Sequence, residues 1–232
     1  DGATSPTATL ERPIPLDRLR GLLSSAFLEL CPADPAPQPS APAAEPRALT
    51  PEEISRVNQA FAPGAEEGGV ADATPASGFF TSYYDDVREL DFAAFLEYYP
   101  DDGTLSAGDE AESDALKTLP GYPWDMSPGA VPTHRITRAS VDAALERYAG
   151  ITAAELADTS GVPYLEEYDA WYTFTSDFGP GKFLCAGGEV DEAAGTARLW
   201  TEPREDGGRA ELALQRDGES WHIRSHRIVN NP

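Results

Sequence analysis

Apolar and polar side chains alternate through residues 180–230, and this alternation restricts the fold more than any other feature of the sequence. A period of two is typical of β-strands with one buried face. Short segments rich in Gly and Asp separate four such runs, and loops of this length connect neighbouring antiparallel strands. The runs are KFLCAGGEV, TARLWTE, RAELALQR and SWHIRSHRIV. They predict an antiparallel β-meander of four or more strands.

The third run predicts which side of this sheet is buried. Ala210, Leu212 and Leu214 point to one side of the strand, whereas Glu211 and Gln215 point to the other. Such a pattern is typical of an antiparallel sheet with one face packed on protein and one face in water. We therefore expect the carboxylate of Glu211 to be solvated.

The sequence before the meander contains helix signals. Thr50-Pro51-Glu52-Glu53 is a complete capping box with a proline in the first turn. Asp91 is expected to cap a short helix, FAAFLEYY. Thr137 is expected to begin a longer helix, which Gly150 would end in a left-handed conformation.

Three further segments carry weaker signals. Ser106 is expected to begin a helix that runs to about Leu119. Thr152-Ala-Ala-Glu155 is a second capping box, sufficient for one or two turns. The aromatic and acidic segment YLEEYDAWYTFTSD, residues 164–177, is expected to change from helix to strand near Tyr172.

Helices that precede a meander indicate an α+β fold and argue against a doubly wound parallel sheet. We expect N-terminal helices packed on a C-terminal antiparallel meander of four or more strands. These elements would form one domain, residues 50–232, with its helical part at 50–160 and its meander at 180–230.

Residues 1–49 are expected to form a stalk outside this domain. Apolar residues at helical spacing predict an amphipathic helix at 15–30, and the segment PADPAPQPSAPAAEP at 32–46 is typical of an extended tether. The first dozen residues resemble a stalk left after removal of a signal peptide. We therefore expect an exported protein, extracellular or at the cell surface, with a lipid anchor upstream of residue 1 as its possible membrane attachment.

Carboxylates dominate the charge of the chain. Among 232 residues, 40 are acidic and 17 are Lys or Arg, which gives a formal net charge of -23. Such a chain repels a phosphate backbone, and no cluster of basic residues interrupts the pattern. No apolar run approaches the roughly 20 residues of a membrane-spanning helix. The composition therefore excludes nucleic acid and bare anionic membranes as partners.

The two cysteines, Cys31 and Cys185, match no metal-binding spacing. They lie far apart in sequence, and a disulfide between them requires Cα atoms within about 7 Å. Two alternatives stay open at this point, a disulfide and two separate buried thiols.

The histidines could form a metal site only if further ligands lay beside them. His222, Arg224 and His226 alternate, so on a regular strand all three would project from one face. A zinc site would need His134 or a carboxylate as a further ligand. We favour the alternative that this face is solvated, and we predict no metal ion.

Three segments, in their order, resemble a known group of proteins. FFTSYYDDVRELDFAAFLEYYP, then HRITRASVDAALERYAGITAAEL, then YLEEYDAWYTFTSD and the meander are similar to segments of secreted or lipoprotein-type proteins from Gram-positive bacteria of the class Clostridia. The resemblance covers residues 50–229 and concerns a group with no assigned activity. It implies export, a lipidated cysteine upstream of residue 1 and helices packed on a C-terminal sheet, and it implies no site residue.

Aromatic side chains are concentrated on two of these segments. We infer that a groove between the helices and the meander binds an extracellular ligand, either a glycan or a peptide. The candidate binding residues are Tyr83, Tyr84, Trp171, Tyr172 and Asp177. The alternative is that the rings form the core beneath the sheet. No motif of a known catalytic class occurs, so we predict no catalytic residue and no cofactor.

The alternative function is an extracellular hydrolase that acts on glycans or peptides. Glu166, Glu167 and Asp169 lie beside aromatic residues in the sequence. Hydrolysis by a carboxylate pair requires two carboxyl groups about 5–10 Å apart across an open cleft, one of them with a raised pKa. In a chain with 40 acidic residues such neighbours are expected by chance. A non-catalytic binding protein is therefore the first prediction.

Overall fold

A computed structural model describes residues 45–65, 71–100, 102–106, 108–119, 132–174 and 180–230. All of them belong to one compact unit that spans residues 44–232. The predicted helix at 15–30 and the proline-rich tether therefore lie outside the described residues, apart from the last two residues of the tether.

The predicted meander is present and is extended by one short strand. β6 (Gly187–Asp191), β7 (Thr196–Trp200), β8 (Gly208–Asp217) and β9 (Ser220–Asn230) pair in sequence order, and every pair is antiparallel. β1 (Arg47–Ala48) adds to the outer edge of β6 and completes a five-stranded sheet. The first run of the alternating pattern becomes a strand only from Gly187 onward.

A second, four-stranded sheet was not predicted. Its order is β2 (Gly103–Thr104), β3 (Thr133–Thr137), β5 (Ala170–Phe174) and β4 (Tyr164–Leu165), and every pair is antiparallel. The expected change from helix to strand near Tyr172 is wrong, because β4 and β5 form a hairpin. The four residues between them make its turn, so the carboxylates there lie in a loop and not on a helix.

The helices follow their local signals closely. Helix α2 (Pro51–Phe61) begins with the predicted capping box, in which Thr50 and Glu53 bind each other's backbone N–H. Helix α5 (Arg138–Ala149) is capped by Thr137 and ends at Gly150, whose φ is +68°. Asp91 caps α3 (Phe92–Glu97). The second capping box forms one turn of 3₁₀ helix, Ala153–Glu155. Further 3₁₀ turns are Ser77–Phe80 and Val87–Glu89.

Helix α4 (Glu110–Leu116) is shorter than predicted. Ser106 does not cap it, because the hydroxyl and the backbone N–H of Ser106 both donate to Oδ2 of Asp109, at 2.9 Å each. The backbone N–H of Asp109 donates to the carbonyl of Ser106 at 3.0 Å, and the helix begins at Glu110. The predicted cap, Ser106, therefore lies three residues before the observed N-cap, Asp109.

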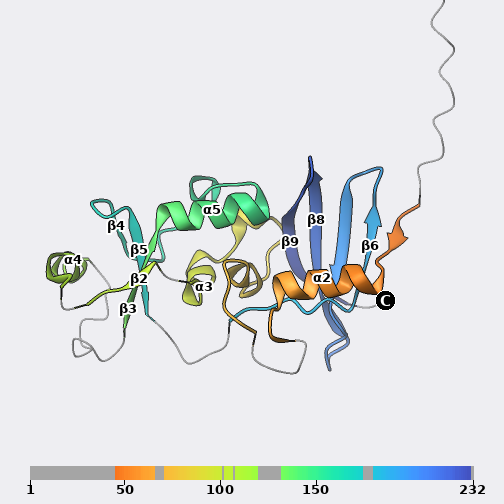
Figure 1. The fold of residues 1–232 in the computed structure, drawn as a ribbon, viewed down its shortest axis with the longest axis horizontal. Helices are drawn as coiled ribbons and strands as arrows, with labels where there is room; N and C mark the ends of the chain where they lie inside the picture. Colours follow the sequence, from red (N-terminus) through yellow and green to blue (C-terminus); the bar gives the residue numbers. More distant parts are fainter. Residues whose placement is uncertain are drawn as a thin grey trace, which may run out of the picture. The chain divides into compact units, whose positions relative to one another are not determined.

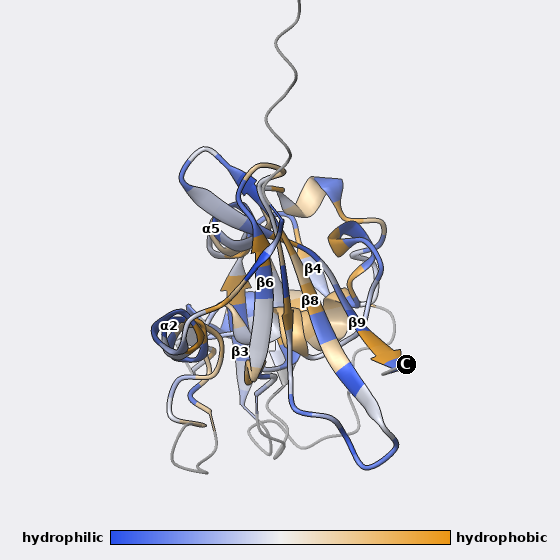
Figure 2. Cartoon of the chain, turned by 90° about the vertical axis from the view of Figure 1, so that its right-hand side faces the viewer, coloured by the Kyte–Doolittle hydropathy of each residue, from blue (hydrophilic) through white to orange (hydrophobic). Residues whose placement is uncertain are grey.

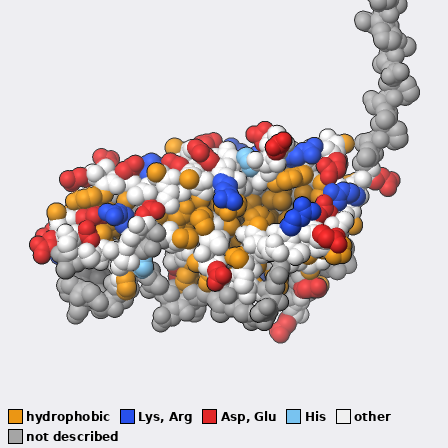
Figure 3. Space-filling model, viewed as in Figure 1, with side chains coloured by type: hydrophobic (Ala, Val, Ile, Leu, Met, Phe, Trp, Pro, Cys, Tyr) orange, Lys and Arg blue, Asp and Glu red, His pale blue; other side chains and the backbone are white. Residues whose placement is uncertain are grey.

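One continuous hydrophobic core joins the two sheets and helices α2, α3 and α5. Figure 1 shows α5 running from the end of β3 to β9, so the same helix contacts both sheets. Figure 3 shows hydrophobic side chains gathered between α5 and α2, where this core reaches the surface. Its large members include Phe79, Phe95, Ile136, Leu145, Trp171, Phe183, Leu199, Leu212 and Ile223.

The face of the five-stranded sheet opposite this core contains an unexpected buried charge. Figure 2 shows hydrophilic and hydrophobic residues alternating along β8. Glu211 was predicted to be solvated, but it is fully buried. Arg198 and Arg227 on the flanking strands donate to its two oxygens at 2.6 and 2.9 Å. Burial opposes ionisation, yet these two arginines hold the pKa of Glu211 below its ordinary value.

Candidate functional site

The structure separates the predicted binding residues and buries most of them. Tyr84, Trp171 and Tyr172 are 5%, 2% and 1% exposed, whereas Tyr83 is 55% exposed. Trp171 and Tyr172 lie on β5, and Tyr84 pairs with the edge of β9. Asp177 lies outside the described residues. These side chains therefore do not line one common groove.

Tyr83 and Tyr84 enclose a histidine. Backbone hydrogen bonds of 2.6 and 3.0 Å join Tyr84 to His226, and the ring of Tyr83 lies 4.7 Å from the imidazole. Phe80 and Phe183 complete the aromatic surroundings, with centroids 5.7 and 6.0 Å away. Tyr84 therefore pairs with the outer edge of β9, and Tyr83 packs on the imidazole of His226.

A β-bulge moves His226 away from the face that it was predicted to share with His222. Ala213 pairs with Ser225 and Leu214 with Ile223, so Arg224 is an extra residue on β9. Directly paired residues share a face, which places His226 with Leu212 on the core side. The predicted common face is therefore wrong. Among the described residues no group of three or more His, Cys, Asp or Glu side chains is arranged to hold a metal ion.

Tyr172 forms its hydrogen bond with a buried side chain of the protein itself. Its hydroxyl donates to Oε1 of the buried Glu112 at 2.5 Å, and Arg135 donates to Oε2 at 3.2 Å. Burial and the bond to Glu112 raise the pKa of Tyr172 well above its ordinary value. Its ring packs with Leu116 and Ala170 in a small separate cluster. Neither the ring nor the hydroxyl of Tyr172 is open to a ligand.

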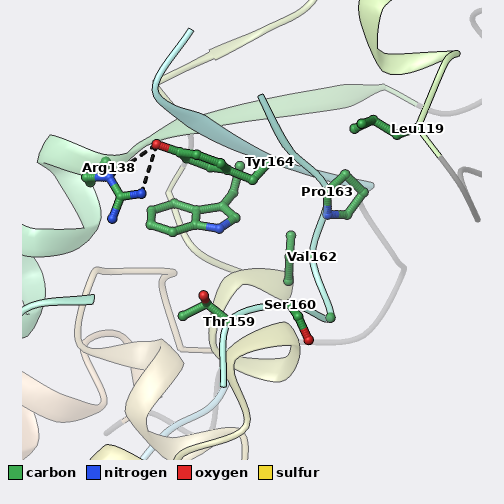
Figure 4. Close-up of a pocket in the computed structure, with 9 residues that line it drawn as sticks. Leu119, Arg138, Thr159, Ser160, Val162, Pro163 and Tyr164 are labelled. Atoms are coloured by element: carbon green, nitrogen blue, oxygen red, sulfur yellow. Dashed lines mark hydrogen bonds between the residues drawn. The ribbon is translucent and has the colours of Figure 1, made fainter. Parts of the chain in front are cut away.

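Trp171, in contrast, lies in the wall of a pocket of about 510 Å³. The pocket is formed by the segment that leads into β4, by the first residue of α5 and by β5. Figure 4 shows Thr159 and Ser160 on the side of the pocket opposite Tyr164. Its lining residues are Leu119, Arg138, Thr159, Ser160, Gly161, Val162, Pro163, Tyr164 and Trp171.

Arg138 is the charged residue of this pocket, and three partners fix its position. Its Nε donates to Oδ1 of Asp169 at 2.9 Å and to the Tyr164 hydroxyl at 3.2 Å, while Nη2 donates to the same hydroxyl at 2.9 Å. Its guanidinium lies 4.9 Å from the ring of Tyr164 and 5.0 Å from that of Trp171. Tyr164 in turn donates to Asp169. The guanidinium is therefore held on one edge and one face.

The chain folds in this way because β3, α5 and the β4–β5 hairpin meet at Asp169. The backbone N–H of Arg138 donates to the carbonyl of Asp169 at 2.8 Å, where β3 ends and α5 begins. Asp169 has a φ of +47°, a left-handed conformation that aspartate tolerates better than most residues. This conformation closes the hairpin turn and brings the carboxylate to Arg138.

These contacts keep both members of the ion pair charged. The hydrogen bond from Tyr164, together with that from Arg138, lowers the pKa of Asp169. The bonds to Tyr164 and Asp169 raise the pKa of Arg138. Burial and the bond to Asp169 raise the pKa of Tyr164, so its hydroxyl stays protonated. The arrangement offers a permanent cation with neutral donors and acceptors beside it.

Sequence reasoning missed Arg138, Tyr164 and residues 159–163 as parts of one site. Trp171 is the one predicted binding residue that lines this pocket. Glu166 and Glu167 are exposed in the hairpin turn and do not line it. The available signal was an arginine directly after the strand-like run THRIT, but its partners lie about 25 to 30 residues further along the chain.

A second pocket, of about 520 Å³, lies where α2 meets the segment before β6. Ile54, Leu184 and Cys185 are among its lining residues. Asn58 braces its floor, because its side chain binds the backbone N–H and carbonyl of Cys185 at 2.7 and 3.1 Å. The side chain of Cys185 is buried, and Cys31, its predicted possible partner in a disulfide, lies outside the described residues.

Comparisons with known proteins place the chain in no family. No family model matches the sequence, and neither the curated proteins nor the solved structures include a significant match. The resemblance to secreted proteins of Clostridia therefore stays a prediction. Within the described residues no helix is both long enough and apolar enough to cross a membrane. The function has to be argued from the geometry of the pocket.

Proposed function

We propose that this chain is an exported or cell-surface protein that binds an extracellular ligand without catalysis, in the pocket between Arg138, Trp171 and residues 159–164. A recess of about 510 Å³ is large enough for a small molecule or for one or two residues of a larger ligand. Its walls combine apolar side chains, such as Val162 and Pro163, with the polar side chains of Arg138, Thr159, Ser160 and Tyr164. Polar groups that converge on a recess with apolar walls can fix the orientation of a ligand.

The observation that supports the proposal best is that Arg138 is held rigidly but has hydrogen-bond donors without a partner in the part of the chain that the structure describes. Its side chain is 36% exposed although three hydrogen bonds hold it. Within the described residues Nη1 of Arg138 has no hydrogen-bond partner. Figure 4 shows one guanidinium nitrogen pointing away from the Tyr164 hydroxyl, toward the side where Thr159 lies. A rigid cation with one open edge in a recess is suited to bind an acceptor group.

The geometry favours binding over hydrolysis. A general acid needs a raised pKa, whereas the contacts of Asp169 lower its pKa. Glu166 and Glu167 lie outside the pocket, so they do not face Asp169 across it. The carboxylate of Asp169 instead positions Arg138. These features support a binding site built around a cation.

The proposed location is supported by the composition of the chain. A dense carboxylate surface keeps an exported protein soluble, and a proline-rich segment such as residues 32–46 is suited to hold a domain away from an anchor. An antibody against the folded domain would label intact cells of the source organism if the location is right. Labelling that appears only after the cells are permeabilised would contradict it.

A peptide and glycan array tests the binding function. Thr159→Phe would fill the pocket without removing a hydrogen bond of the described structure, and Thr196→Phe on β7 adds the same ring far from it. We expect the wild type and Thr196→Phe to bind the same array spots, and Thr159→Phe to lose them. Urea unfolding of all three proteins checks that they fold. If no spot binds, or if Thr159→Phe binds as the wild type does, the proposal is wrong.

A further inference from the structure

We propose that this pocket recognises a carboxylate next to a small branched apolar group, as in an N-acylated leucine or the C-terminal residue of a peptide. The inference rests on the proposed binding function and specifies its ligand class. It depends on three observations: the open edge of Arg138, the position of Asp169 relative to that edge, and the apolar wall beside it.

The first observation concerns the hydrogen-bonding edges of Arg138. Its Nε and Nη2 both donate to the Tyr164 hydroxyl, so the edge formed by these two atoms is occupied. The other edge, formed by Nη1 and the second hydrogen of Nη2, has no partner among the described residues. A guanidinium edge of this kind offers two parallel donors at the spacing of two carboxylate oxygens. A single hydroxyl or amide oxygen would use only part of it.

The second observation concerns charge. Asp169 accepts from Nε, at the opposite end of the guanidinium from Nη1. A carboxylate bound at the open edge would therefore lie closer to the cation than to Asp169, and the attraction would exceed the repulsion. The charge of -23 is distributed over the whole chain, and salt at physiological strength screens charges beyond about 8 Å. An anion is thus compatible with this site in an acidic protein.

The third observation concerns the walls. Leu119, Val162 and Pro163 give the pocket an apolar side, and Figure 4 shows Pro163 and Leu119 on the side away from Arg138. The Arg138 guanidinium and the rings of Tyr164 and Trp171 lie 4.9 to 5.0 Å from one another, so they pack as one group beside this apolar side. Trp171 is 2% exposed, so its ring offers little surface for a sugar to stack on. An aliphatic side chain attached to the carboxylate fits the apolar side of the pocket.

Isothermal titration of N-acetyl-L-leucine and of its uncharged amide tests the proposal. The two probes differ only in the carboxylate, and the peptide Ala-Ala-Leu distinguishes a peptide C-terminus from a free acyl amino acid. We expect the acid to bind at least about tenfold more tightly than the amide, because paired charge-assisted hydrogen bonds are lost in the amide. Arg138→Gln should remove this difference. Arg147→Gln, on the last turn of the same helix, should keep it.

The outcomes separate this inference from the function on which it rests. If acid and amide bind equally and Thr159→Phe abolishes both, the pocket binds ligands but the carboxylate inference is wrong. If neither probe binds while array spots depend on Thr159, the ligand class is wrong and the binding function stands. If Arg138→Gln does not fold, the probe pair with Thr159→Phe still decides, because an acid preference that survives a filled pocket contradicts the proposal.

Discussion

Acid should destabilise this protein through His226 before its carboxylates titrate. His226 is 3% exposed, and its Nδ1 lies 2.7 Å from the carbonyl of Ser82. A carbonyl only accepts, so Nδ1 carries the proton and the ring is held as a neutral donor. Tyr83 and Tyr84 face the ring, and the nearby Asp85 pairs at 4.0 Å with Arg227. No carboxylate of the described residues pairs with the imidazole.

This environment determines whether acid lowers or raises the free energy of unfolding, and by how much at most. Burial lowers the pKa of His226, and the hydrogen bond to Ser82 offsets only part of that shift. The unfolded chain therefore binds a proton near the ordinary histidine pKa of about 6.5, while the folded protein does not. The contribution is fully present above that pH and is lost as the pH falls toward the folded pKa. One proton limits the loss to about 1.4 kcal/mol per pH unit.

Urea unfolding at pH 7.5, 6.5 and 5.5 measures this slope. The comparison uses the wild type, His226→Phe, which keeps a planar ring among the aromatic neighbours, and His222→Gln as a matched control on the same strand. We expect His226→Phe to be less stable at pH 7.5 by about 1 kcal/mol, because the Ser82 carbonyl loses its donor. It should also lose less stability than the wild type on acidification. Equal slopes for wild type and His226→Phe would refute the reasoning.

Two further substitutions test the packing that positions the pocket. Tyr172→Phe removes a hydrogen-bond donor from the buried carboxylate of Glu112 and should lower the free energy of unfolding by about 1.5–3 kcal/mol. The control, Tyr83→Phe at an exposed residue, should lower it by less than about 0.5 kcal/mol. Gly150→Ala should cost about 1–2 kcal/mol from its left-handed φ, and more because the new Cβ would lie 2.1 Å from Nδ1 of His222. Gly161→Ala, with 3.9 Å to its nearest neighbour, is the control. Urea denaturation measures both pairs, and a substitution no more costly than its control contradicts the structure at that residue.

Local signals in the sequence predicted the ends of α2 and α5, although not the start of α4, because each signal depends on a few adjacent residues. The capping box at Thr50 and the left-handed Gly150 are found as expected. The alternating pattern likewise predicted the meander, since a period of two with short Gly and Asp loops has few other solutions. These features need no knowledge of the rest of the chain.

The second sheet was not predictable in the same way. Its edge strands β2 and β4 have two residues each, too few for an alternating pattern to appear. Pairing between β3 and β5 joins segments about 35 residues apart, and nothing local indicates it. The bulge at Arg224 and the burial of Glu211 also depend on neighbouring strands. The pocket was missed for the same reason, since its residues meet only through this pairing.

Arg138 is one of several arginines that bind a carboxylate of this acidic chain. In the described structure several other arginines bind carboxylates that the fold has placed beside them. Arg47 binds Glu53, Arg135 binds Glu112, and Arg198 and Arg227 both bind Glu211. Basic side chains are scarce in this sequence, and these four arginines form ion pairs with carboxylates of the same chain. Arg138 has its own carboxylate partner and still presents two donors to a recess, which is why a carboxylate of another molecule is the ligand that this pocket is suited to bind.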